Sequence, residues 1–127
     1  MSEDSVFKEN LFKGKKVFIT GGATGMGLGF AQAFLNHGAE VFIASRKEDK
    51  LKQAAEETEK KFGKKLIWKT MDVRNNETVE EAIEFLNSEW GELDILVNNA
   101  AGNFVAPIAA MSENAWRSVV DIVLDGT

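Results

Sequence analysis

Cysteine and tyrosine are absent from this 127-residue sequence, and histidine occurs once. Without cysteine, disulfides, thiolate zinc sites and a cysteine nucleophile are excluded. A single histidine and no cysteine also leave too few nitrogen and sulfur ligands for a transition metal, and we predict no metal site. These absences exclude thiol chemistry and argue against transition-metal chemistry.

Excess positive charge and long apolar segments are missing too. The chain has 15 basic and 20 acidic residues and a net charge of −5. That charge predicts no nucleic-acid partner and no anionic membrane surface. No apolar run approaches the roughly 20 residues that span a bilayer. The opening "MSEDSVFKENLFKGK" resembles neither a transit peptide nor a secretory signal. We therefore expect a protein that is not secreted and lies in the cytoplasm or an organelle matrix (mitochondrion or peroxisome in a eukaryote).

Short, nearly continuous apolar segments alternate with segments of helical periodicity. Residues 16–20, 40–45, 66–73 and 93–100 are typical of strands buried on both faces of a parallel sheet. The expected helices are marked by apolar positions Phe30, Ala33 and Phe34; Leu51, Ala54, Ala55, Thr58 and Phe62; Val79, Ala82, Ile83, Leu86 and Trp90; and Trp116, Val119, Val120 and Val123. The alternation predicts an α/β fold, a Rossmann-type doubly wound parallel sheet with four strands and about four helices.

Two parts of the chain are distinguished. Residues 1–12 are interpreted as a polar N-terminal tail and docking segment, whose Phe7, Leu11 and Phe12 are expected to cover the edge of the sheet. Residues 13–127 form the predicted Rossmann portion, without an internal repeat or linker.

The first expected strand leads directly into "TGGATGMG", residues 20–27. A phosphate-binding turn needs outward N–H groups, no Cβ where the pyrophosphate approaches, and a helix directly behind it. Gly21 permits the tight turn, Gly25 lets the backbone approach the ligand, and Gly27 lets the helix lie close to the strand. A merely flexible connection is the alternative. A strand before the turn and a helix after it favour nucleotide binding.

The end of the second expected strand carries Ser45, Arg46 and Lys47. An NAD-binding site places an acid there for the ribose 2′-hydroxyl. Here no carboxylate would repel a 2′-phosphate, and a guanidinium is present to meet it. The alternative is that Arg46 is an ordinary surface cation. We predict NADP(H) rather than NAD(H).

Three motifs together carry a family resemblance: "TGGATGMG", "MDV" at the end of the third strand and "NNAAG" at the end of the fourth. In this order and spacing they resemble the short-chain dehydrogenase/reductase superfamily. The longer matches "IASRK", "MDVR", "NNAAGNF" and "SENAW…DIVLDGT" resemble its 2,4-dienoyl-CoA reductases. The active-site Asn that most superfamily members carry on the fourth helix is replaced by Val123, as in that subfamily. Asp125 stands where relatives often have Asn.

The resemblance implies cofactor-binding and substrate-binding residues. Asp72 and Val73 would hold the adenine, and Asn103 would act catalytically by donating to the thioester carbonyl oxygen. Arg74, Phe104 and Ser112 would line the path of an acyl-CoA substrate. The implied NADP(H)-binding residues are Thr20, Gly21, Gly22, Ala23, Thr24, Gly25, Met26, Gly27, Arg46, Asp72, Val73, Asn98, Ala100 and Gly102.

The implied reaction is NADPH-dependent reduction of a 2,4-dienoyl-CoA thioester, an auxiliary step of unsaturated fatty acid β-oxidation. Because the superfamily's Tyr, Ser and Lys belong to a region beyond residue 127, we expect this chain to be an inactive N-terminal fragment of a longer, homo-oligomeric (tetrameric) reductase. Two alternatives stay open. One is another superfamily reductase, acting on a carbonyl or a β-ketoacyl thioester. The other is a non-catalytic nucleotide-binding module.

Overall fold

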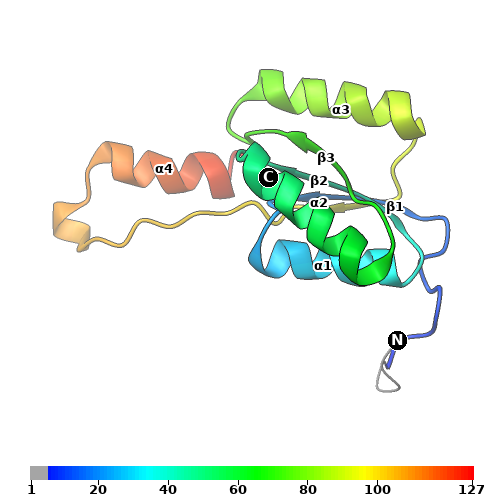
Figure 1. The fold of residues 1–127 in the computed structure, drawn as a ribbon. Helices are drawn as coiled ribbons and strands as arrows, with labels where there is room; N and C mark the ends of the chain where they lie inside the picture. Colours follow the sequence, from blue (N-terminus) through cyan, green and yellow to red (C-terminus); the bar gives the residue numbers. More distant parts are fainter. Residues whose placement is uncertain (1–5) are drawn as a thin grey trace.

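A computed structural model of the chain describes residues 6–127. Its centre is a parallel sheet in the order β3-β2-β1-β4 (Figure 1). The strands are β1 (Lys16–Thr20), β2 (Glu40–Ser45), β3 (Ile67–Thr70) and β4 (Ile95–Val97). With the four α-helices of the described chain, this arrangement confirms the predicted Rossmann-type α/β fold.

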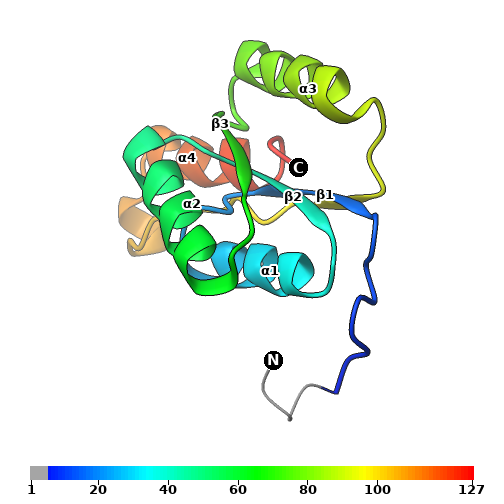
Figure 2. The same ribbon diagram turned by 45° about the vertical axis from the view of Figure 1, so that its right-hand side comes forward.

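Helices cover both faces of the sheet. α1 (Gly25–Asn36) and α2 (Glu48–Phe62) lie on one face, and α3 (Asn76–Trp90) lies on the other (Figures 1 and 2). A short 3₁₀ helix, η1 (Ile108–Ala110), precedes α4 (Glu113–Val123). None of the helices among residues 6–127 is long and apolar enough to cross a membrane.

Two buried clusters form the core, one on each face of β1 and β2. Successive side chains of a strand point to opposite faces, so Val17 and Ile19 pack towards α1 and α2 while Phe18 packs towards α3. Phe42 of β2 meets Phe18 edge to face at 4.8 Å between ring centroids. The two central strands are therefore rigid supports, and their carboxyl ends fix the loops that follow.

The buried face of α1 differs from the predicted one. The sequence periodicity placed Phe30, Ala33 and Phe34 inwards. Phe34 is partly buried and packs against the core, but Phe30 and Ala33 are exposed, and the buried residues are Gly27, Ala31 and Leu35. Because Gly27 lies against the turn before the helix, the residues four and eight positions later share its face. Phe30 is left exposed.

The third and fourth strands are shorter than the predicted segments 66–73 and 93–100. Asp72 turns back to accept the N–H of Arg74, so its peptide leaves the sheet. Beyond Val97, the N–H groups of Asn99 and Ala100 donate to the side-chain hydroxyl of Thr20 on neighbouring strand β1, and not to a backbone carbonyl as in a strand ladder.

α4 extends away from the sheet, to which it returns only at its C-terminal end (Figure 1). Ala115 and Ile122 are its buried residues. Of the predicted apolar stripe, Trp116 and Val123 are exposed, whereas Val119 and Val120 are partly buried. Leu96 on edge strand β4 is half exposed.

The N-terminal segment lies at the C-terminal end of α1 rather than along the edge of the sheet. Phe12 packs edge to face on Phe34 at 4.8 Å, and Phe7 meets His37 at 5.9 Å. The Phe12 N–H donates to the His37 carbonyl. Leu11 stays half exposed, and residues 1–5 of the predicted tail lie outside the described part of the chain.

Candidate functional site

The principal cleft opens at the carboxyl ends of the parallel strands and has a volume of about 340 Å³. Its wall combines the turn after β1, the ends of β2 and β3, and the segment after β4. Ile122 near the end of α4 closes one side. Open parallel sheets bind ligands at this edge, where the strand order reverses on either side of the first strand.

The glycine-rich turn forms the floor of the cleft next to the N-terminus of α1. Gly21 and Gly25 have φ values of +66° and +56°, which favour glycine. A Cβ on Gly25 would meet nothing within 4 Å, whereas one on Gly27 would lie 2.5 Å from the Asn99 amide nitrogen. Gly25 is an exposed residue between Thr24 and Met26, which line the cleft, and the open space beside it would let a ligand approach the backbone. The crowding at Gly27 holds the helix close to the turn.

The start of α1 has no side-chain cap within residues 6–127. Its N-cap, Thr24, makes no side-chain capping bond, and Thr24 and Met26 line the cleft. The first N–H groups of a helix lack intrahelical partners and carry a partial positive charge. This arrangement suits a phosphate oxygen at the mouth of the cleft.

Thr20 and Asn99 join the glycine-rich turn to the loop after β4. The Thr20 hydroxyl accepts the N–H groups of Asn99 and Ala100, each at 3.0 Å. In return the Asn99 side-chain amide donates to the carbonyls of Thr20 and Gly21, each at 3.1 Å. These four bonds lock the two loops in one relative position.

Charged residues line the opposite side of the cleft. Arg46 follows β2 and Asp72 follows β3, and both contribute to the wall with Ser45 and Val73. Among residues 6–127, Arg46 forms no ion pair. The cleft therefore holds one cation without a carboxylate partner.

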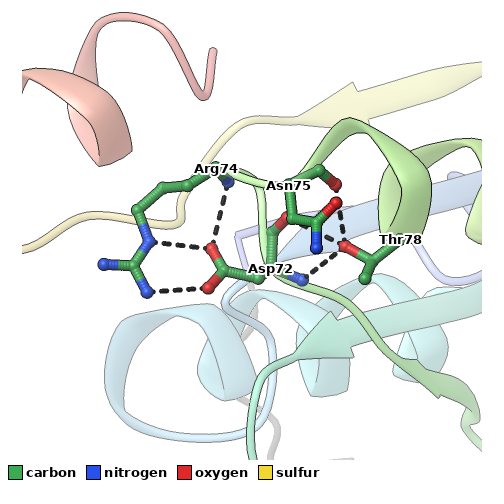
Figure 3. A network of polar contacts seen from close by, with 4 residues as sticks. All are labelled: Asp72, Arg74, Asn75 and Thr78. Carbon is green, nitrogen blue, oxygen red and sulfur yellow. Dashed lines mark hydrogen bonds and ion pairs between the residues drawn. The ribbon is translucent and has the colours of Figure 1, made fainter.

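Asp72 is held by Arg74 in a two-pronged contact (Figure 3). Nε of Arg74 donates to Oδ1 of Asp72 at 2.9 Å and Nη2 donates to Oδ2 at 2.7 Å, while the Arg74 backbone N–H adds a third bond at 3.0 Å. This contact holds the pKa of the Asp72 carboxyl below its usual value, and it raises the pKa of Arg74. The carboxylate therefore stays ionised and oriented.

Thr78 fixes the backbone that carries this pair. Its hydroxyl accepts the Asp72 N–H at 3.0 Å and lies within hydrogen-bond distance of the Asp72 and Asn75 carbonyls (Figure 3). Asn75 caps α3 by accepting the Glu77 N–H. The helix start and the cleft residue Asp72 are thus one hydrogen-bonded unit.

The structure brings some of the predicted cofactor-binding residues together and leaves others outside the cleft. The predicted residues that line it are Gly21, Thr24, Met26, Gly27, Arg46, Asp72, Val73 and Ala100. Thr20, Gly22 and Ala23 are buried behind the turn, and a Cβ on Gly22 would lie 2.6 Å from Ile43. Gly25, Asn98 and Gly102 are exposed and do not line the cleft.

The predicted catalytic and substrate-binding residues lie elsewhere. Asn103 and Phe104 are exposed in the extended segment between β4 and η1 (Figure 1). Ser112 caps α4, its hydroxyl accepting the Ala115 N–H at 3.1 Å. Arg74 is engaged with Asp72. Within residues 6–127 these four do not converge on one pocket, and their roles stay predictions.

Asn99 is the main residue that sequence reasoning missed. Of the pair Asn98–Asn99, the first was assigned to the cofactor, whereas the second lines the cleft and holds the turn. Alternation along a strand is the signal that could have found it, since two successive side chains point to opposite faces. Only one of the two amides can face the first strand's turn.

Metal chemistry has no centre in the described part of the chain, where no group of three or more His, Cys, Asp or Glu side chains could hold an ion. The cleft offers helix N–H groups, a guanidinium and oriented amides instead. That donor set fits a phosphorylated organic ligand.

Comparison with known proteins identifies the family to which the chain belongs. Residues 15–127 match the short chain dehydrogenase family. Peroxisomal 2,4-dienoyl-CoA reductase [(3E)-enoyl-CoA-producing] of Danio rerio is 38% identical over 122 residues, covering 96% of this chain and 41% of the relative. The chain thus spans less than half the length of that relative.

Solved structures agree. A short chain dehydrogenase from Bacillus anthracis is 46% identical, with a TM-score of 0.82 over 88% of this chain and 46% of its own. L-sorbose reductase from Gluconobacter frateurii, complexed with NADPH and L-sorbose, is 32% identical, with a TM-score of 0.83 over 90% of this chain and 43% of its own. The family match and these likenesses support a nicotinamide cofactor. By sequence motifs, fold and family match, the chain belongs to the short-chain dehydrogenase family.

Proposed function

We propose that residues 13–127 are the NADP(H)-binding part of a reductase that acts on 2,4-dienoyl-CoA thioesters. The observation that carries the proposal is the cleft itself, which is lined by a glycine-rich turn, a helix N-terminus and Arg46, an arginine without an ion-pair partner in the described part of the chain. The similarity to a 2,4-dienoyl-CoA reductase over nearly the whole chain supports the substrate class.

NADP(H) is proposed over NAD(H) because of the charge at the end of β2. Arg46 lines the cleft and forms no ion pair with a carboxylate of residues 6–127, so it is available to a 2′-phosphate as a charge-assisted donor. Gly25 and the N-terminus of α1 would hold the diphosphate, and Asp72 and Val73 the adenine. When bound, the cofactor supplies the hydride, and the protein supplies position and electrostatic field.

The segment after β4 is proposed to serve the substrate. Asn98, Ala100 and Gly102 would border the nicotinamide, and Asn103 would donate an N–H to the thioester carbonyl oxygen, where negative charge develops during reduction. The acyl-CoA path would be lined by Arg74, Phe104 and Ser112.

Catalysis is proposed to need residues beyond this chain. The sequence contains no tyrosine. The Asn103 amide would be a single donor group, whereas a developing oxyanion is stabilised by several preorganised donors. We propose that this chain is the N-terminal part of a longer, homo-oligomeric reductase located in the cytoplasm or an organelle matrix. The name of the Danio rerio relative favours the peroxisome.

The test compares two proteins: the 127-residue chain alone, and the protein expressed with whatever coding sequence follows Thr127. Loss of NADPH absorbance is followed with a 2,4-dienoyl-CoA thioester. We expect turnover only by the second protein. Turnover by the 127-residue chain would refute the fragment proposal, and no turnover by either would refute the assigned reaction.

A second candidate is reduction of a carbonyl or β-ketoacyl thioester. The likeness to L-sorbose reductase over 90% of this chain favours keeping it. A β-ketoacyl-CoA thioester and a simple ketone serve as parallel substrates in the same assay. Faster reduction of either would replace the dienoyl assignment.

A further inference from the structure

Arg74 stands beside the proposed cofactor cleft without lining it. Its backbone N–H, Nε and Nη2 all bind the Asp72 carboxylate, at 3.0, 2.9 and 2.7 Å. Both carboxylate oxygens therefore receive a donor from the same guanidinium. Such a two-pronged contact fixes the orientation of the carboxylate and neutralises much of its charge.

Arg46 is the second guanidinium that acts on Asp72. Arg46 and Asp72 line the same cleft. The positive charge of Arg46 contributes to lowering the Asp72 pKa, after the larger effects of Arg74. Yet Arg46 forms no ion pair among residues 6–127, while Arg74 pairs with Asp72. The Asp72 carboxylate is thus influenced by two guanidinium groups, and it is bound by Arg74, which lies outside the cleft, and not by Arg46, which lines it.

We propose that Arg74 is a positioning residue for dinucleotide selectivity: by occupying Asp72, it leaves Arg46 unpaired and available to the 2′-phosphate of NADP(H). This inference rests on the proposed function. It gives Arg74 a role that acts through Asp72, separate from any contact with acyl-CoA.

Removal of the Arg74 side chain should weaken NADPH binding in two ways. The freed carboxylate of Asp72 attracts Arg46, which competes with the 2′-phosphate for the same guanidinium. The uncompensated negative charge also repels that phosphate directly, because like charges in a partly desolvated cleft are unfavourable. NADH lacks the 2′-phosphate, so its binding is affected far less.

The experiment measures Kd for NADPH and for NADH by fluorescence titration without acyl-CoA. It uses the protein expressed with whatever coding sequence follows Thr127. In Arg74→Ala, we expect the preference for NADPH over NADH to fall about tenfold, the size expected for one charge-assisted hydrogen bond. In the double variant Arg74→Ala/Asp72→Asn, we expect the preference to return to the wild-type value.

Further variants separate positioning from a general structural effect. Asp72→Asn alone should weaken both dinucleotides equally and leave their ratio unchanged, since it removes an adenine contact that both ligands share. Arg74→Lys keeps the charge but loses the fork, and we expect an intermediate ratio. It also serves as the test should Arg74→Ala not fold, as judged by its melting curve.

Two results would overturn the inference. If Arg74→Ala and Arg74→Lys keep the wild-type preference, Arg74 does not govern Arg46, and the proposed cofactor site stands without it. If the double variant fails to recover the preference, the effect does not pass through Asp72. Failure of the wild-type protein to bind either dinucleotide would overturn the proposed function, and this inference with it.

Discussion

At the scale of single residues, the cleft is defined by a few side chains whose partners decide what remains free. The Asn99 side-chain amide donates to two backbone carbonyls, and the Arg74 guanidinium donates to the Asp72 carboxylate. Arg46 has no such partner among residues 6–127. The groups left available to a ligand are therefore a guanidinium and the first N–H groups of α1.

Arg46 is the residue on which cofactor preference should depend. In Arg46→Ala we expect NADPH to bind about tenfold more weakly, because a charge-assisted bond to the 2′-phosphate is lost, while NADH affinity hardly changes. Parallel titrations with the two dinucleotides measure this. Lys47→Ala is the matched control, since Lys47 is an exposed neighbouring cation outside the cleft. Equal weakening of NADPH by both variants would show a diffuse charge effect instead.

Asn99 should matter for stability as well as for the cleft. Asn99→Ala removes both side-chain bonds to the carbonyls of Thr20 and Gly21, leaving partly buried acceptors unpaired at a cost of about 1–3 kcal/mol. Denaturant unfolding measures the loss. The adjacent Asn98→Ala is the control, because Asn98 is exposed and should change the unfolding free energy by less than about 0.5 kcal/mol. Equal effects would contradict the assigned roles.

The Asp72–Arg74 pair predicts a pH dependence of stability. Arg74, and more weakly Arg46, lower the pKa of Asp72 in the folded protein, and Asp121 also acts on Arg74. A carboxyl with a lowered folded pKa contributes stability above its unfolded pKa of about 3.9, and this is lost as the pH falls through the folded value. The difference in unfolding free energy between wild type and Asp72→Asn should therefore shrink below about pH 4. A constant difference between pH 3 and 6 would contradict the ionised pair.

At the scale of the elements, the turn and helix α1 form the most tightly fitted part of the site. Gly27→Ala would place a Cβ 2.5 Å from the Asn99 amide nitrogen and against the Gly21 backbone. We expect a loss of about 1–3 kcal/mol from this overpacking, together with weaker dinucleotide binding.

Gly29→Ala is the matched control for that variant. A Cβ on Gly29 would meet nothing within 4 Å, and Gly29 lies inside α1. Its replacement should stabilise the protein by about 0.4–1 kcal/mol, since alanine restricts the unfolded chain more than glycine does. Thermal unfolding of both variants gives the comparison. Equal destabilisation would show that helix α1, rather than the contact at Gly27, is sensitive to substitution.

Elements with strong local signals were predictable from the sequence. The four strands, the order of strands and helices, and the glycine-rich turn are confirmed because apolar runs and glycine spacing report backbone requirements directly. The predicted inward face of α1 was right only for Phe34, because glycine and alanine, at positions 27 and 31, lie in the interior while Phe30 is exposed. The size of an apolar side chain does not predict burial where the helix backbone packs closely against a neighbouring turn or strand. Asp72 and Arg74 are only two residues apart in "MDVR", but their two-pronged contact depends on the directions of the two side chains, which the sequence does not give.

At the scale of the whole molecule, one side of the described chain is well covered and the other is not. Strands β1 and β2 are buried between helices, whereas β4 stands at the edge with Leu96 half exposed. Further large apolar side chains are exposed beyond it: Phe104, Val105, Ile108, Trp116, Val123 and Leu124. An uncovered strand edge beside apolar side chains promotes association.

The 127-residue chain on its own is therefore expected to self-associate. Sedimentation velocity should show oligomers or aggregates that grow with concentration. The Leu96→Lys variant, which puts a charge on the exposed edge, should shift the distribution towards monomer. A monodisperse wild-type monomer that melts cooperatively would contradict this expectation.

The central claim is that the turn at residues 20–27 and Arg46 together hold NADP(H). A crystal structure of the protein, expressed with whatever coding sequence follows Thr127 and bound to NADP⁺, tests it most directly. We predict the diphosphate against the N-terminus of α1 at Gly25 and the 2′-phosphate within hydrogen-bond distance of the Arg46 guanidinium. A dinucleotide bound outside this cleft, or Arg46 turned away from the adenosine end, would contradict the account.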